Sequence, residues 1–191
     1  QYQRPLPWRV NPQPYSVWLS EVILQQTRVA QGLPYYQKFV STFPDVFALA
    51  RAPEQQVLRL WQGLGYYSRA RNLHRCAQQI VNIYKGIFPD NYQSLKTLPG
   101  IGDYTAAAIA SIVYNERIAV VDGNVFRVLS RVFGIDAPIN SVQGRKLFVD
   151  LANALMPATN PGEYNQAIME FGALWCTPKN TQCEPCIFKK Q

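Results

Sequence analysis

The chain has 191 residues, 48% of them hydrophobic and 16% charged, and this is long enough to bury a core in one domain or in two small lobes. Nineteen lysines and arginines against twelve aspartates and glutamates give a net charge of +7, which favours a polyanionic partner such as nucleic acid. The sequence has no apolar run of about 18 residues and no signal-peptide pattern, so we expect a soluble, intracellular protein without membrane contact.

The positions of proline and glycine predict helices along the whole length of the chain. Prolines stand at expected first-turn positions (Pro14, Pro34, Pro53, Pro161) and glycines at expected helix ends (Gly63, Gly86, Gly134). Apolar residues recur at intervals of three and four over 15–31, 34–43, 54–61, 66–85, 103–114, 123–133, 142–155 and 162–175. We therefore predict an all-α fold, in which Asp122 and Ser141 are helix N-caps.

Glu21 is a candidate general acid in the first helical run. It lies in the apolar segment Trp18–Leu24, and a carboxylic acid against an apolar face keeps its proton to a higher pH. Such an acid can protonate a leaving base, as cleavage of a glycosidic bond requires. The alternative is an acid that is only paired or that extends to solvent.

The segment Leu98-Pro99-Gly100-Ile101-Gly102 lies between a short helical turn and the alanine-rich run that follows it. Two glycines around one apolar residue permit a tight turn whose N–H groups face outward at a helix N-terminus, where an anion is favoured. Such a turn can hold a DNA phosphate. An ordinary corner between two helices is the alternative.

Asp122 directly precedes a helical run, where the helix dipole and exposed amides stabilise an anion. A permanent anion beside a sugar that develops oxocarbenium character complements a neutral acid near the leaving group. The alternative for Asp122 is a structural N-cap without a chemical role. The sequence does not show whether Glu21 and Asp122 approach each other.

Three cysteines near the C-terminus, Cys176, Cys183 and Cys186, have the spacing C-x6-C-x2-C and can surround one metal centre. The one histidine, His74, is about a hundred residues away, which favours an iron–sulfur cluster over a zinc site. We interpret His74 as structural or phosphate-contacting and Cys76 as an inert buried thiol.

Five motifs together resemble the MutY branch of the endonuclease III, or helix-hairpin-helix, superfamily. They are Trp18-Leu19-Ser20-Glu21, Leu24-Gln25-Gln26-Thr27, Gly63-Leu64-Gly65-Tyr66-Tyr67, Leu98-Pro99-Gly100-Ile101-Gly102 and Val121-Asp122-Gly123-Asn124-Val125. The segment Asn165-Gln166-Ala167 and the cysteine spacing extend the resemblance over almost the whole chain.

The resemblance implies two lobes. One is a six-helix barrel with the helix-hairpin-helix, residues 14–118, and the other is a discontinuous cluster domain, residues 1–13 and 119–191, truncated at its C-terminus. It also implies a 4Fe–4S cluster held by Cys176, Cys183 and Cys186, and the family spacing places the fourth cysteine just beyond residue 191.

The resemblance further implies an adenine DNA glycosylase of base excision repair. Such an enzyme acts as a monomer on duplex DNA with adenine opposite 8-oxoguanine or guanine, in the bacterial cytoplasm or in a nucleus or mitochondrion. Glu21 would protonate the flipped adenine and help to activate water, and Asp122 would stabilise the cationic sugar. Asn124 would orient the sugar, Tyr104 would line the site, and Arg9 with Glu170 would read the adenine edge.

The same resemblance assigns the DNA contacts. Gln26 and Tyr66 would fill the gap that the flipped base leaves, and their alternatives are a helix-end amide and a packed aromatic ring. Further contacts with DNA would come from Thr27, Leu98, Gly100 and Gly102.

Tyr104 occupies the position at which bifunctional relatives carry a lysine nucleophile, so we predict a monofunctional glycosylase. Two alternatives stay open. One is a superfamily glycosylase for thymine or uracil mismatches or for oxidised pyrimidines, and the other is a noncatalytic DNA-binding module.

Overall fold

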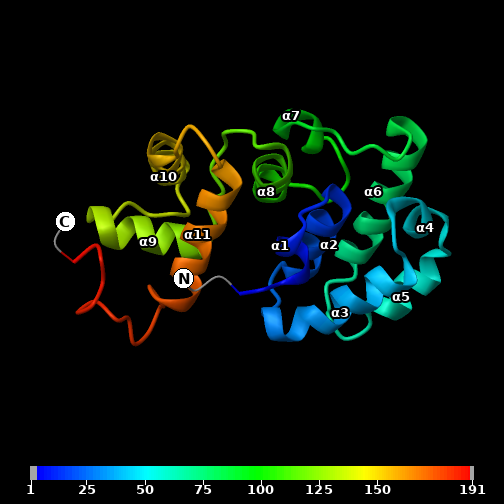
Figure 1. The fold of residues 1–191 in the computed structure, drawn as a ribbon, viewed down its shortest axis with the longest axis horizontal. Helices are drawn as coiled ribbons and strands as arrows, with labels where there is room; N and C mark the ends of the chain where they lie inside the picture. The colour runs from blue at the N-terminus through cyan, green and yellow to red at the C-terminus, as the bar shows by residue number, and fades with distance from the viewer. Residues whose placement is uncertain (1–3, 190–191) are drawn as a thin grey trace. The chain divides into compact units, whose positions relative to one another are not determined.

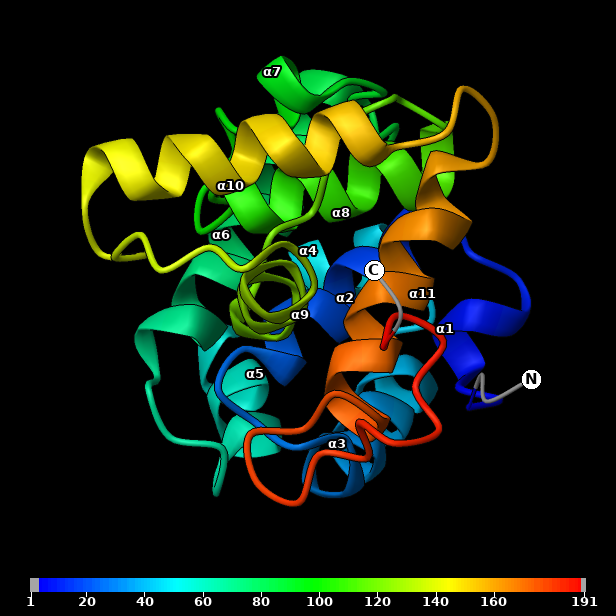
Figure 2. The ribbon, with the colours of Figure 1, turned by 90° about the vertical axis from the view of Figure 1, so that its left-hand side faces the viewer.

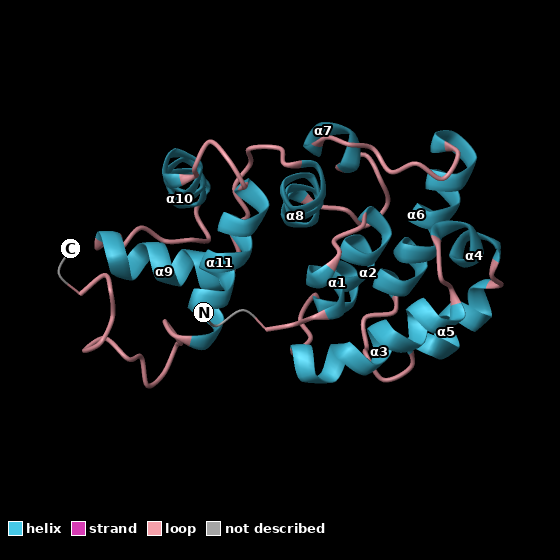
Figure 3. Ribbon diagram, viewed as in Figure 1, coloured by secondary structure: helices cyan, strands magenta, loops and turns pink. Residues whose placement is uncertain are grey.

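A computed structural model describes residues 4–189, and these residues form helices and loops without a strand (Figure 3). The prediction of an all-α fold is confirmed. Within this range no helix is both long and apolar enough to cross a membrane.

The chain divides into two compact units. Leu6–Tyr114 forms one, here called the hairpin unit, and Gln1–Pro5 together with Asn115–Gln191 forms the other, here called the cysteine unit. The sequence placed the first boundary at residue 14, whereas the observed boundary follows Pro5. The reason is that Trp8 is buried and packs edge-to-face on Tyr36, with ring centroids 4.8 Å apart, which ties residues 6–13 to the hairpin unit.

The hairpin unit is arranged around one central helix, α2, which packs against α1, α3, α6 and α8 (Figures 1 and 2). Trp18, Leu19 and Ile23 of α2 are fully buried, which explains its central place. The helices of this unit are α1 (Pro7–Val10), α2 (Pro14–Leu24), α3 (Val29–Thr42), α4 (Val46–Arg51), α5 (Glu54–Trp61), α6 (Ser68–Tyr84), α7 (Tyr92–Leu95) and α8 (Asp103–Tyr114).

Two expectations for this unit are wrong. The helix expected over 15–31 ends at Leu24, because Gln26 has a φ of +57° and turns the chain before α3 begins at Val29. Pro34 therefore lies inside α3 and not in its first turn.

The apolar pattern does not predict helix α4. Its first turn is capped by the Asp45 carboxylate, which accepts from the Ala48 N–H at 2.7 Å.

The cysteine unit contains α9 (Gly123–Phe133), α10 (Val142–Leu155) and α11 (Pro161–Leu174), and α9 packs against both of the others (Figure 1). Its core includes Val125, Leu129 and Phe148. Both expected N-caps are confirmed, since Asp122 accepts from the amides of the first turn of α9 and Ser141 accepts from the Gly144 N–H.

Candidate active site

Glu21 lies on the central helix α2 of the hairpin unit. Its side chain is half-buried, whereas its neighbours Ser20 and Val22 are buried. The apolar pattern around Glu21 therefore places the carboxyl group at the edge of the core, where it can be shielded from bulk water and still meet a substrate.

The turn after α2 presents Gln26 to solvent. Gln26 has a left-handed backbone conformation, and the Thr27 N–H donates to the Leu24 carbonyl at 3.1 Å to close the turn. The neighbouring Gln25 points inward, and its amide donates to the Thr105 hydroxyl at 3.3 Å. This bond fixes the turn to α8 beside the half-buried Tyr104.

A second loop, between α5 and α6, presents Tyr66. Its side chain is 67% exposed and its φ is +47°. Gly63 in the same loop has a φ of +102°, and a Cβ there would lie 2.3 Å from the Tyr35 hydroxyl oxygen. The loop thus requires glycine at position 63 and holds an aromatic ring out of the core at position 66.

The hairpin between α7 and α8 has the expected tight turn. Gly100 has a φ of +75°, the Ile101 N–H donates to the Leu98 carbonyl, and a Cβ at Gly102 would meet nothing within 4 Å. Leu98 is only 2% exposed, so its side chain belongs to the core and only its backbone is left for a contact with DNA.

The first residue of α8, Asp103, is neutralised by its neighbours. Its carboxylate accepts from the Tyr92 hydroxyl at 2.7 Å and forms an ion pair with Lys96. The bond to Asp103 raises the pKa of Lys96, so this lysine stays charged beside the turn. The positive charge of Lys96 therefore offsets part of the repulsion that an acid at this helix start would exert on a phosphate.

Asp122 and Asn124 form a compact cluster at the start of α9 in the cysteine unit. The Asp122 carboxylate accepts from the Asn124 N–H at 2.9 Å, the Val125 N–H at 2.8 Å and the Asn124 side-chain amide at 2.8 Å. These three donors fix the orientation of the carboxylate. Both side chains are half-buried.

Arg127 joins this cluster to the segment of Cys176. It donates to the Asn124 side-chain oxygen at 2.8 Å, the Gly172 carbonyl at 2.7 Å and the Cys176 carbonyl at 2.7 Å. Gly172 lies so close that a Cβ on it would be 2.7 Å from the Asn124 Cβ. Helix α11 therefore supports Asn124 through backbone contact.

Glu170 on α11 is buried, and its carboxylate accepts two bonds from Arg4, at 2.5 and 2.7 Å. The family resemblance pairs Glu170 with Arg9 as the readers of adenine. Arg9 lies on α1 of the hairpin unit and is half-buried. The residue that donates to Glu170 in the described bonds is thus Arg4, which the motifs do not indicate.

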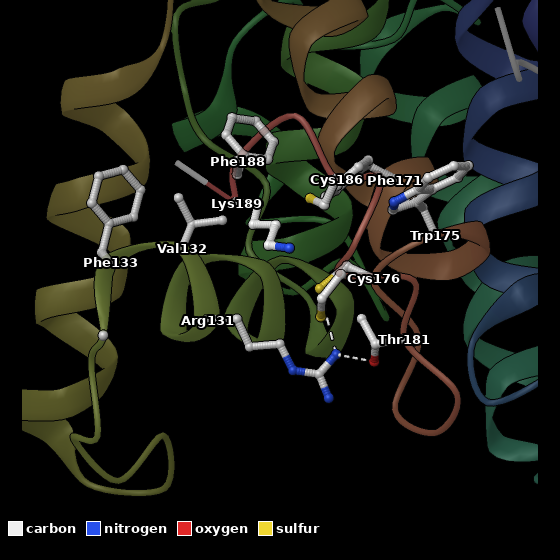
Figure 4. A pocket seen from close by; sticks show the side chains of 12 residues that line it. Arg131, Val132, Phe133, Phe171, Trp175, Cys176, Thr181, Cys186, Phe188 and Lys189 are labelled. Atoms are coloured by element: carbon white, nitrogen blue, oxygen red, sulfur yellow. Dashed lines mark hydrogen bonds between the residues drawn. The ribbon is translucent and has the colours of Figure 1, made fainter. Parts of the chain in front are cut away.

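The three cysteines Cys176, Cys183 and Cys186 line one pocket of the cysteine unit, with a volume of about 760 Å³ (Figure 4). Arg131 donates to the Cys176 sulfur at 3.5 Å and to the Thr181 hydroxyl at 2.8 Å, as the dashed lines in Figure 4 show. Over residues 4–189, however, no three His, Cys, Asp or Glu side chains lie close enough together to hold a metal ion. These thiols are the kind of donor that holds an iron–sulfur cluster and supply three of its four cysteine ligands, and in this structure their sulfurs are not gathered around one centre.

Four arginines with structural contacts in and around these sites, Arg4, Arg69, Arg127 and Arg131, are not indicated by the sequence motifs. Arg127 lies three residues after Asn124 on one helix, and this spacing is a usable signal for a side-chain pair. Arg4 bonds Glu170, Arg69 bonds the Gln25 carbonyl and Arg131 bonds Cys176, all more than forty residues away, so no local pattern points to these three arginines.

The comparisons with known proteins agree with this architecture. Residues 19–151 match the family model described as the HhH-GPD superfamily base excision DNA repair protein. The chain belongs to the HhH-GPD superfamily. The predicted resemblance to helix-hairpin-helix glycosylases is thereby confirmed at the level of the family.

Curated relatives of this HhH-GPD protein carry the name adenine DNA glycosylase. One, from Buchnera aphidicola of Acyrthosiphon pisum, is 41% identical over 99% of this chain and 54% of its own length. Another, from Rattus norvegicus, is 44% identical over 97% of this chain and 38% of its own length. The chain thus spans about half the length, or less, of the curated relatives that it matches.

Solved structures give the same fold. A thermostable thymine-DNA glycosylase is similar with a TM-score of 0.90 and 29% identity, over 100% of this chain and 88% of that one. A non-covalent endonuclease III–DNA complex is similar with a TM-score of 0.81 and 20% identity, over 95% of this chain and 84% of that one. The second similarity supports the fold alone.

Proposed function

We propose that this chain is the catalytic part of a monofunctional DNA glycosylase that removes adenine opposite 8-oxoguanine or guanine. The observation that carries the proposal is the similarity over 99% of the chain to a protein named adenine DNA glycosylase. The family match over residues 19–151 also includes Glu21, Tyr104, Asp122 and Asn124. We further propose that the chain acts as a monomer in the compartment that holds the genome.

In the proposed reaction, the duplex releases adenine from its stack and the glycosylase holds the extruded nucleoside. The bond between the sugar C1′ and adenine breaks, and its electron pair leaves with the base. Glu21 donates a proton to that base, and the Asp122 carboxylate stabilises the positive charge on the sugar. Glu21, now a carboxylate, takes a proton from water as its oxygen adds to C1′, which regenerates the acid and leaves an abasic site.

Asn124 has a positioning role in this proposal. Its side-chain amide donates to Asp122 while Arg127 donates to its oxygen, so the amide cannot rotate freely. A fixed carboxylate is worth more to a transition state than one that must reorient during the reaction.

We assign the proposed 4Fe–4S cluster to Cys176, Cys183 and Cys186, whose thiolates would hold it at the pocket of Figure 4. When bound, the cluster would fix the loop from Cys176 to Cys186 as a structural cross-link. Arg131 already holds this loop, because it donates to the Thr177 carbonyl at 2.7 Å and to the Thr181 hydroxyl.

The test is single-turnover base release from four duplexes with adenine opposite 8-oxoguanine, adenine opposite guanine, a G:T mismatch, and thymine glycol. We expect release of adenine from the first two. Glu21→Gln should lower that release by about 100-fold or more while duplex binding is kept, since one proton donor is removed. The control is Glu54→Gln, an exposed acid on α5, which should release adenine at the wild-type rate.

A second candidate function is removal of thymine from G:T mismatches, favoured by the 29% identity and TM-score of 0.90 to a thymine-DNA glycosylase. Release of thymine without release of adenine would select this function and reject the first.

Borohydride trapping tests the monofunctional mechanism. Tyr104 offers no amine for a Schiff base, so we expect no trapped covalent product. Abundant covalent enzyme–DNA product would contradict it.

A further inference from the structure

Arg69, in the first turn of α6, donates to the carbonyls at the end of α2. Its Nη1 donates to the carbonyl oxygens of Val22 at 3.2 Å, Ile23 at 3.3 Å and Gln25 at 2.5 Å. The last carbonyls of a helix lack partners within the helix and carry its partial negative charge. Arg69 therefore caps α2 from a distant position and fixes the residue that precedes Gln26.

The same side chain also holds the loop between α5 and α6. Its Nη2 donates to the Leu64 carbonyl at 3.2 Å. Its guanidinium carbon lies 5.1 Å from the centre of the Trp61 ring and 5.7 Å from that of Tyr66. Trp61 is fully buried and donates to the Gly65 carbonyl at 2.9 Å, so it anchors the loop from the other side.

The two segments that meet at Arg69 share an unusual feature. Each presents one exposed side chain from a residue with positive φ, +57° at Gln26 and +47° at Tyr66. Residues other than glycine adopt this conformation at a cost in free energy, so surrounding contacts must hold them there. Arg69 supplies such contacts to both segments at once.

We propose that Arg69 is a positioning residue that holds Gln26 and Tyr66 in one fixed arrangement, so that both enter the duplex together when the base is extruded. The inference rests on the proposed function, in which these two side chains fill the gap left by the base. Lysine cannot replace Arg69, because an ammonium has three donors on a point charge and lacks the planar fork that bonds several carbonyls while stacking on rings.

The central test is a double-mutant cycle of Arg69→Lys and Gln26→Ala. Its first readout is single-turnover adenine release, and its second is the fluorescence of 2-aminopurine placed at the target position opposite 8-oxoguanine. The fluorescence is measured with Glu21→Gln in every protein so that the base is extruded but not released. Each assay is run well below the melting temperature of every variant, and binding to undamaged duplex is measured alongside.

We expect Arg69→Lys to slow adenine release by about 10- to 100-fold, because a displacement of about 1 Å in a positioning contact can cost up to about 100-fold. The 2-aminopurine signal should fall in parallel. In the Arg69→Lys protein, Gln26→Ala should have almost no additional effect, because Gln26 is already out of place. If the two effects instead multiply within about twofold, Arg69 only stabilises the fold and the inference is wrong.

Arg71→Lys is the matched control. Arg71 lies on the same helix, is exposed, and contacts Glu54 at 3.6 Å. It should leave adenine release within about twofold of wild type, and its effect should multiply with that of Gln26→Ala.

If Arg69→Lys does not fold, Trp61→Phe tests the same inference. This variant keeps a ring beneath Arg69 and removes the donor to the Gly65 carbonyl. It should slow release and reduce the effect of Gln26→Ala, and an undiminished effect of Gln26→Ala would overturn the inference. A wild-type protein that releases no adenine would reject the proposed function alone, whereas equal rates for wild type and a folded Arg69→Lys protein would reject the role of Arg69 alone.

Discussion

Asp122 is an N-cap in the structure, and the proposed reaction gives it a second, chemical role. Its carboxylate accepts from the Asn124 and Val125 amides, so it is an N-cap of α9, and it also accepts from the Asn124 side chain. A cap needs only an oxygen acceptor, whereas stabilisation of a cationic sugar needs a negative charge. A pair of substitutions separates these requirements.

Asp122→Ser keeps a capping oxygen and removes the charge, whereas Asp122→Ala removes both. We expect Asp122→Ser to change the free energy of unfolding by less than about 0.5 kcal/mol and Asp122→Ala to lower it by about 1 kcal/mol. Both should lower adenine release by about 100-fold or more. Wild-type release from the serine variant, in a single-turnover assay, would leave Asp122 as a cap alone.

Cys76 shows how burial sets the chemistry of one residue. Its side chain is fully buried, and this burial raises the pKa of the thiol far above its ordinary value. Since the thiolate is the reactive form, Cys76 should remain unmodified by iodoacetamide at pH 8 in the folded protein and react fully in denaturant. Peptide mass mapping measures this, and rapid labelling in the native state would contradict it.

At the scale of elements, regular apolar patterns were the most informative part of the sequence. The runs at 54–61, 103–114, 123–133 and 142–155 coincide with α5, α8, α9 and α10. The break between α2 and α3 could not be predicted, because the positive φ of Gln26 is supported by contacts from Arg69, more than forty residues later. The family motifs indicated the Asp122–Asn124 pair, while Arg4 at Glu170 depends on contacts that only the fold creates.

Two glycines of the hairpin, Gly100 and Gly102, allow a matched pair of alanine substitutions. Gly100→Ala places a Cβ 2.7 Å from the Asn72 Cβ in a residue with positive φ, so it should lower the free energy of unfolding by about 1–3 kcal/mol. Gly102→Ala meets nothing within 4 Å, so it should leave stability unchanged. Its methyl group would nevertheless obstruct a phosphate, and we expect about tenfold weaker duplex binding. Unchanged binding by Gly102→Ala would exclude the hairpin as a phosphate site.

The contact between α9 and α11 leads to another prediction. A Cβ at Gly172 would lie 2.7 Å from the Asn124 Cβ and 2.9 Å from its carbonyl oxygen, so Gly172→Ala must displace the first turn of α9. We expect a loss of about 1–3 kcal/mol in the free energy of unfolding. We also expect slower adenine release after the rate has been corrected for the measured fraction of folded protein. Gly123→Ala, with open space at its Cβ, is the control for stability.

At the scale of the whole molecule, the net charge of +7 agrees with a polyanionic partner and predicts that DNA binding depends on the salt concentration. Cations that neutralise phosphates release counterions, so duplex affinity should fall at least about tenfold between about 50 and 200 mM salt. Fluorescence anisotropy over a salt series measures the slope. An affinity independent of salt would show that the basic residues do not face the DNA.

The ion pair of Arg4 and Glu170 joins positions 166 residues apart, on either side of the hairpin unit in the sequence. Because Glu170 is made 166 residues after Arg4, this ion pair cannot form during synthesis until the whole hairpin unit has been made. The cysteine unit therefore completes its fold only after the hairpin unit has been synthesised.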